Sequence, residues 1–171
     1  NLILSEEHGR TFNNALSKLD ESINEMRRVA HNMMPEALMK LGLQQALQDY
    51  CDGLSDSQAF KINGEFYGLE KRLEPSVEIV LYRIVQELLG NILKHAKAKE
   101  ANLQMLENDL FLLITIEDDG VGFDSNIGDS DGIGLSNVRN RTEMLHGQMH
   151  LESFPGKGTF VSIKIPKNEL G

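Results

Sequence analysis

The chain of 171 residues is long enough for one domain, or for one domain with an appended element. Its 17 basic and 26 acidic residues give a net charge of -9 with no Lys/Arg block, which disfavours a nucleic-acid partner. No apolar run approaches the roughly 18 to 20 residues that cross a bilayer, and the single cysteine, Cys51, excludes an internal disulfide.

The chain begins at Asn1 without a methionine, within sequence of helical character, so we expect a fragment of a longer protein. The start of the chain lacks the basic region and long apolar stretch of a signal peptide. We therefore expect the fragment to be cytoplasmic, with any membrane anchor in upstream segments. Cys51 is expected to be a buried packing residue in a reducing compartment.

A heptad pattern occupies the first part of the chain and stops at Pro35. Its apolar positions are Phe12, Leu16, Leu19, Ile23, Met26, Ala30 and Met33. This period predicts a long helix that packs in a coiled coil or bundle, and one apolar stripe needs a partner helix. We predict a homodimer through this helix; packing against the chain's own domain is the alternative. A second amphipathic stretch follows Pro35, so the predicted division is 1–40 for helix and connector and 41–171 for a globular domain.

From about residue 57 the pattern mixes helices and strands. The predicted elements are a strand at 59–67, a helix at 76–97, strands at 101–106 and 110–117, a helix at 135–146, and a hairpin of 148–154 with 158–165. This order favours an α+β fold, a two-layer sandwich with helices on one face of a mostly antiparallel sheet. A doubly wound parallel sheet fits the pattern less well.

A polar stripe lies on the helix predicted at 76–97. At about 100° per residue, Glu87, Asn91 and Lys94 fall within roughly a 60° arc, and apolar residues cover the rest of the helix. Burying these groups without partners costs several kcal/mol. The stripe therefore calls for a polar ligand, a metal or a mutually satisfied network.

Three glycine-rich segments follow the stripe. Asp118 ends a predicted strand ahead of Gly120 and Gly122, where its carboxylate can accept a hydrogen bond from a ligand amino group. The segment D-G-I-G-L, with Gly132 and Gly134, leads into a helix and can present backbone N–H groups to phosphate. In G-K-G-T at 156–159, the last residue, Thr159, is expected to support Asp118 from a neighbouring strand. Ordinary turns would also explain each segment alone.

In this order, the Glu/Asn/Lys stripe, D-x-G-x-G, G-x-G-L and G-x-G-T resemble the ATP-binding domain shared by gyrase-type topoisomerases, large heat-shock chaperones, histidine kinases and mismatch-repair ATPases. The resemblance covers roughly residues 57–166 and implies a Bergerat-type fold preceded by a long helix. The segments R-R-V-A-H-N-M-M-P-E-A-L-M-K-L-G-L-Q-Q-A-L at 27–47 and G-I-G-L-S-N-V-R-N-R at 132–141 are similar to sensor histidine kinases of the nitrate-sensor type.

The resemblance implies ATP and Mg2+ as ligand and cofactor. It places Asp118 on the adenine amino group and Asn91 on Mg2+, and it assigns Glu87 to orienting or deprotonating the nucleophile. The remaining residues implied at the nucleotide are Lys94, His95, Gly120, Gly122, Gly132, Gly134, Leu135 and Thr159. The family commonly has Asn after the first aspartate, and this chain has Asp119, so a contact from that position is in doubt.

The implied function is that of a protein histidine kinase in a two-component signal-transduction phosphorelay. The γ-phosphoryl group of ATP would pass to a histidine on an upstream helix outside this chain, and then to a response regulator. None of the five histidines present is expected to be the acceptor; His8 and His31 lie at the wrong places relative to Pro35. The alternatives are an anti-sigma-factor-type serine kinase and a non-catalytic, nucleotide-gated interaction module.

Overall fold

The computed structural model describes residues 36–57, 60–124 and 132–171, and Ala37–Gly171 form one compact unit. The elements in chain order are α2 (Glu36–Leu41), α3 (Leu43–Ser57), β1 (Lys61–Tyr67), α4 (Pro75–Asn91), the π-helical turn η1 (Ile92–Ala96), β2 (Glu100–Glu107), β3 (Phe111–Asp118), α5 (Ile133–Met144), β4 (Gln148–Ser153), β5 (Thr159–Pro166) and the 3-10 turn η2 (Lys167–Glu169). The predicted heptad helix lies outside the described residues.

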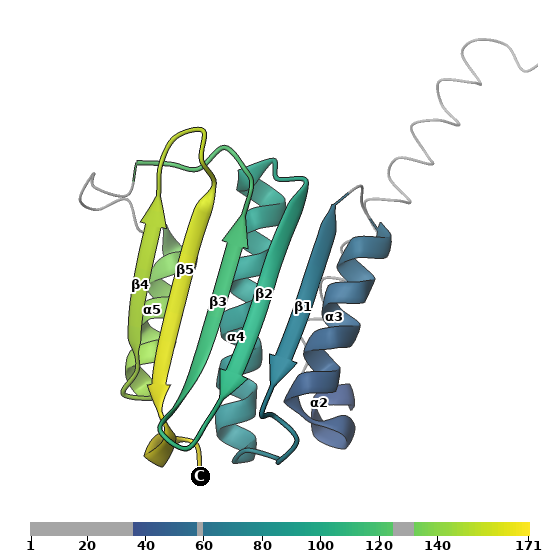
Figure 1. The fold of residues 1–171 in the computed structure, drawn as a ribbon, viewed down its shortest axis with the longest axis vertical. Helices are drawn as coiled ribbons and strands as arrows, with labels where there is room; N and C mark the ends of the chain where they lie inside the picture. Colours follow the sequence, from purple (N-terminus) through teal and green to yellow (C-terminus); the bar gives the residue numbers. More distant parts are fainter. Residues whose placement is uncertain (1–35, 58–59, 125–131) are drawn as a thin grey trace, which may run out of the picture. The chain divides into compact units, whose positions relative to one another are not determined.

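The strands form one five-stranded sheet in the order β1-β2-β3-β5-β4 (Figure 1). β1 pairs with β2 in parallel, and the other three pairings are antiparallel. The predicted α+β fold with a mostly antiparallel sheet is therefore confirmed. The register pairs Ala101 with Asp118 and Asp118 with Thr159, so three strands meet at the end of β3.

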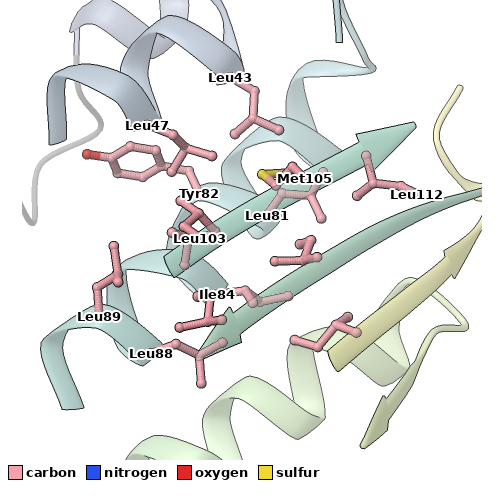
Figure 2. Close-up of a cluster of buried hydrophobic side chains, with 14 of the residues drawn as sticks. Leu43, Leu47, Leu81, Tyr82, Ile84, Leu88, Leu89, Leu103, Met105 and Leu112 are labelled. Atoms are coloured by element: carbon pink, nitrogen blue, oxygen red, sulfur yellow. The ribbon is translucent and has the colours of Figure 1, made fainter. Parts of the chain in front are cut away.

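The core lies between one face of the sheet and the helices. Alternate residues of β2 and β3, among them Leu103, Met105 and Leu112, are fully buried because period-2 alternation turns them toward α4. Figure 2 shows these side chains packed with Leu81 and Ile84 of α4. α4 and α5 cover this face, and α3 packs against β1 and α4 (Figure 1). The burial makes α4 a fixed support for its polar residues.

The amphipathic stretch after Pro35 forms two helices because Gly42, at φ +90°, interrupts it. Glycine adopts this left-handed backbone at no steric cost. α3 buries Leu43, Ala46, Leu47 and Cys51. The expectation that Cys51 is a buried packing residue is confirmed.

The opposite face of the sheet is polar over β1 and β2. Asn63 donates a hydrogen bond to Asn102 at 2.8 Å, and Gln104 donates one to Glu65 at 2.8 Å. Across the ranges that the structure describes, no helix combines the length and the apolar character needed to span a membrane.

Candidate nucleotide-binding site

The predicted polar stripe begins on α4, which starts at Pro75 with Glu74 as its N-cap; the Glu74 side chain accepts from the Ser76 backbone N–H. Glu87 and Asn91 are half-buried near the end of this helix, while neighbouring Leu88 and Leu89 are buried in the core. The helix thus buries its apolar side against the sheet and leaves a carboxylate and an amide at its last two turns.

The predicted helix at 76–97 is wrong in its last part, because the α-helix ends at Asn91 and a π-helical turn follows. Lys94 and His95 lie in this turn, η1, and both are exposed. The 100° spacing used to align Lys94 with Asn91 does not apply where the hydrogen bonding changes to i→i+5. η1 ends at Ala96, and its C-cap residue, Lys97, has a left-handed φ of 52°.

The first turn of α5 lies beside the C-terminal end of α4. A Cβ added at Gly134 would lie 2.5 Å from Glu87 Oε1 and 3.0 Å from Asn91 Nδ2, so the backbone of Gly134 approaches as only glycine allows. Gly132 is the N-cap residue of α5 and is exposed, and Leu135 packs partly buried against the core. The structure therefore brings Glu87, Asn91 and Gly134 together.

Asp118 lies at the end of β3 and is 5% exposed. Its Oδ1 accepts a hydrogen bond from the backbone N–H of Gly120 at 2.8 Å, and Thr159 hydrogen-bonds to it through backbone and side chain. Burial raises the pKa of the Asp118 carboxyl above its ordinary value, and the negative charge of Asp119 adds to this, while the bonds from Gly120 and Thr159 act in the opposite direction. Thr159 therefore lies beside Asp118, as the predicted support requires, and its role in ligand binding stays a prediction.

The glycines of the two loops after β3 and β4 pack against each other. A Cβ at Gly158, which has φ +76°, would lie 1.9 Å from the carbonyl oxygen of Asp118. A Cβ at Gly122 would lie 2.1 Å from the carbonyl oxygen of Phe154. The two loops are also joined by a hydrogen bond from the N–H of Gly156 to the carbonyl of Val121, at 2.6 Å. Side chains at these glycines would separate the loops and displace Asp118.

Two residues of this region were not predicted from the sequence. Ser153, 1% exposed, accepts from the N–H of Phe123 at 2.9 Å, donates to the carbonyl of Gly158 at 3.1 Å and lies 3.0 Å from Thr159 Oγ1. The inward position of a serine on an alternating strand was the available signal. The second is Asp119, whose carboxylate accepts two backbone hydrogen bonds. No motif marked either contact.

The site offers carboxylate and amide oxygen atoms, which are suitable ligands for a hard metal ion. Within the described ranges, no three His, Cys, Asp or Glu side chains gather into a group that could hold a metal ion. Mg2+ binds proteins through one or two oxygen ligands, with substrate phosphates and water completing its coordination. The Asn91 amide beside Glu87, at the cradle that a Cβ on Gly134 would fill, fits such an ion. Residues 125–131, in the loop between Asp118 and Gly134, lie outside the described residues.

Comparison with known proteins finds similarity to one domain family and to several longer proteins. Residues 76–169 match the family described as histidine kinase-, DNA gyrase B-, and HSP90-like ATPase. Over 145 residues, 85% of the chain, it is 33% identical to the signal transduction histidine-protein kinase/phosphatase DegS of Brevibacillus brevis. Over 150 residues, 86% of the chain, it is 31% identical to the sensor histidine kinase ComP of Bacillus subtilis (strain 168).

These matches span 38% of DegS and 20% of ComP, so the chain corresponds to part of each relative. Among solved structures, the histidine kinase domain of the blue-light activated histidine kinase of Erythrobacter litoralis EL346 shares the fold, with a TM-score of 0.59 at 22% identity, over 75% of this chain and 66% of that one.

Proposed function

The chain belongs to the histidine kinase-, DNA gyrase B- and HSP90-like ATPase family, and on this basis we propose that it is the ATP-binding catalytic domain of a sensor histidine kinase. Two relatives named as histidine kinases match more than four fifths of the chain. They favour a kinase over the other kinds of protein in this broad family. The observation that carries the proposal is the close approach of Gly134 to Glu87 and Asn91 on α4. The η1 turn that follows α4 is hydrogen-bonded at Ala96 to Val121, in the loop after Asp118.

Asp118 binds the adenine end of ATP in this proposal. An ionised carboxylate accepts a hydrogen bond from the exocyclic amino group, and burial excludes the water that would compete for it. One oxygen is already used by the N–H of Gly120, which fixes the orientation of the carboxylate. Gly120, Gly122 and Thr159 shape the surrounding backbone.

The phosphate end of ATP lies at the junction of α4 and α5. Asn91 contributes an amide oxygen for Mg2+, and Lys94 and His95 lie exposed on η1, where they can reach the phosphate chain. Gly132, Gly134 and Leu135 form the start of α5, where backbone N–H groups favour an anion. When bound, Mg2+ supplies charge neutralisation over the transferring phosphoryl group.

Glu87 orients or deprotonates the nucleophile, which we propose is a histidine on an upstream helix. Phosphoryl transfer depends mainly on positioning and on charge stabilisation, so fixed groups on a buried helix suit it. The phosphoryl group then passes to a response regulator. Dimerisation through residues 1–40, a cytoplasmic location, and the boundary at residue 41 remain predictions.

Replacing Asn91 tests the site. We expect Asn91→Ala to weaken ATP binding in the presence of Mg2+ by at least about tenfold, roughly 1.4 kcal/mol, because an oxygen ligand is lost. Calorimetric titration of the 171-residue chain measures this, and circular dichroism confirms that the variant folds. Asn168→Ala, in η2, is the matched control and should bind ATP as the unchanged chain does. Equal affinity in Asn91→Ala and the unchanged chain would remove the site assignment.

A further inference from the structure

Asp119 is exposed, yet its carboxylate has two defined partners. Oδ1 accepts hydrogen bonds from the backbone N–H groups of Lys99, at 2.7 Å, and Glu100, at 3.0 Å. The backbone N–H of Asp119 donates to the carbonyl of Glu100 at 3.3 Å. Side chain and backbone of Asp119 therefore bind the same short segment at the start of β2.

The segment held by Asp119 is the turn that connects η1 to β2. It contains the left-handed Lys97. The carbonyl of Ala96, at its beginning, accepts a hydrogen bond from the N–H of Val121 at 2.7 Å. A Cβ added at Gly120 would lie 2.4 Å from that carbonyl oxygen. The loop after β3 is thus fastened to both ends of the turn, by Val121 at residue 96 and by Asp119 at residues 99 and 100.

We propose that Asp119 is a positioning residue for ATP binding, holding the adenine-binding loop in a fixed place relative to the end of α4. This inference rests on the proposed function, in which ATP spans from Asp118 to Asn91. These two residues belong to different elements. The 96–100 turn follows the helix that carries Asn91 and is hydrogen-bonded to the loop that follows Asp118. A site whose two ends are already held at the right separation loses less entropy on binding than one that must be ordered by the ligand.

The hydrogen bonds of Asp119, and not its charge alone, are the basis of the role. The N–H groups of Glu100 and Lys99 hold the pKa of the Asp119 carboxyl below its ordinary value, so the group is ionised at neutral pH and its bonds are charge-assisted. An asparagine at this position still offers one oxygen to both N–H groups, whereas alanine offers none. The two substitutions therefore separate the hydrogen bonds from the charge.

The test compares Asp119→Ala, Asp119→Asn and the unchanged 171-residue chain in calorimetric ATP titrations with Mg2+. We expect Asp119→Ala to bind ATP about tenfold more weakly, the equivalent of one or two lost hydrogen bonds, and Asp119→Asn to recover most of the affinity. Hydrogen exchange should show faster exchange of the amides of Lys99 and Glu100 in the alanine variant only. Asp109→Ala, at the turn that joins the opposite ends of β2 and β3, is the matched control and should leave affinity and these amides unchanged.

Unchanged ATP affinity in Asp119→Ala, or an asparagine variant as weak as the alanine variant, would overturn the inference. Failure of the proposed function has a different signature, because the unchanged chain itself would then bind no ATP. Thermal unfolding of each variant separates a loss of affinity from a loss of fold. An alanine variant that is fully folded, with exchange at residues 99 and 100 as slow as in the unchanged chain, would also overturn the inference.

Discussion

Asp118 is an acid whose surroundings act on its ionisation in opposite directions. Burial against the loop after β4 disfavours the carboxylate, and hydrogen bonds from Gly120 and Thr159 favour it. The net effect raises the pKa of Asp118, so the folded chain holds a proton on this group at a higher pH than the unfolded chain does. An adenine amino group would offset this penalty by donating a hydrogen bond to the carboxylate.

The raised pKa predicts how stability depends on pH. Because the folded state binds the proton more tightly, the contribution of Asp118 to the free energy of unfolding falls as pH rises through the interval between the unfolded pKa, about 3.9, and the raised folded pKa. The Asp118→Asn variant lacks this titration. We therefore expect the unchanged chain to gain stability relative to Asp118→Asn as pH falls through that interval.

Urea unfolding of both chains from pH 7 to pH 3.5 measures this difference. Asp109→Asn is the control, because it changes the same side chain at an exposed turn. A stability difference between the unchanged chain and Asp118→Asn that is constant over the whole range would contradict the prediction.

At the level of single residues, the residues that belong to a sequence motif could be predicted. Residues that act only through hydrogen bonds to distant backbone groups could not. Asp118, Gly120 and Gly158 stand in D-x-G-x-G and G-x-G patterns, since the close approaches at these positions require particular residues. Ser153 and Asp119 act through backbone N–H and carbonyl groups that no spacing rule reveals. Their partners became visible only when the register of β2, β3 and β5 placed the strand ends together.

Arg72, which lies between β1 and α4, links helix α2 to the start of α4. Arg72 donates two hydrogen bonds to Glu78, from Nε to Oε1 at 2.8 Å and from Nη2 to Oε2 at 2.6 Å, and it also donates to the carbonyl of Leu38 at 3.2 Å. The Glu78 side chain is 3% exposed. A Cβ on Gly42 would lie 2.8 Å from Arg72 Cδ, so the glycine also makes room for the arginine.

Removing Arg72 would leave the carboxylate of Glu78 buried without its cation, which is the costly way to break such a pair. We expect Arg72→Leu to unfold at a lower urea concentration than the unchanged chain. The double variant Arg72→Leu/Glu78→Gln should recover part of this loss, because glutamine is neutral and still accepts from the N–H of Leu73.

Hydrogen exchange of the Gly42 amide, which bonds to the Leu38 carbonyl at 3.2 Å, reports whether the end of α2 has loosened. The prediction fails if Arg72→Leu is as stable as the unchanged chain, or if the double variant is less stable than the single one.

At the level of elements, the spacing of apolar residues predicted the helices and strands, because these depend on local sequence. The alternation in β2 to β5 and the helical spacing in α4 and α5 gave the right elements, with ends displaced by a few residues. The parallel pairing of β1 with β2 spans the whole of α4, so no hairpin signal reports it. The π-helical turn at 92–96 was missed because its residues have the same apolar spacing as an α-helix. Its last residue, Ala96, contacts Gly120 and Val121, which are distant in sequence and leave no local signal.

At the scale of the whole molecule, the positions of the histidines decide what the chain can do alone. His150 lies on the face of the sheet opposite to α4, where its Nε2 is 2.8 Å from Glu152. His146 follows the far end of α5, 12 residues long or about 18 Å, and its Nδ1 is 2.9 Å from Glu169. Both therefore lie away from a phosphoryl group held between Asn91 and Gly134. His95, exposed on η1, is assigned in the proposed function to binding the phosphate chain and not to accepting the phosphoryl group. His8 and His31 lie outside the described residues.

We therefore predict that the 171-residue chain binds ATP and Mg2+ without phosphorylating itself on histidine. In-line transfer needs the acceptor nitrogen about 3 Å from the phosphorus, and a rigid sheet and the length of α5 keep His150 and His146 away from it. Incubation with γ-labelled ATP, followed by acid and alkali treatment, should detect no acid-labile label. A longer form of the protein with the expected upstream helix should incorporate acid-labile label and lose it in the Asn91→Ala variant. Acid-labile label on the 171-residue chain that disappears in His8→Gln, His31→Gln or His95→Gln would contradict the prediction, and acid-stable label on a serine would point to the serine-kinase alternative.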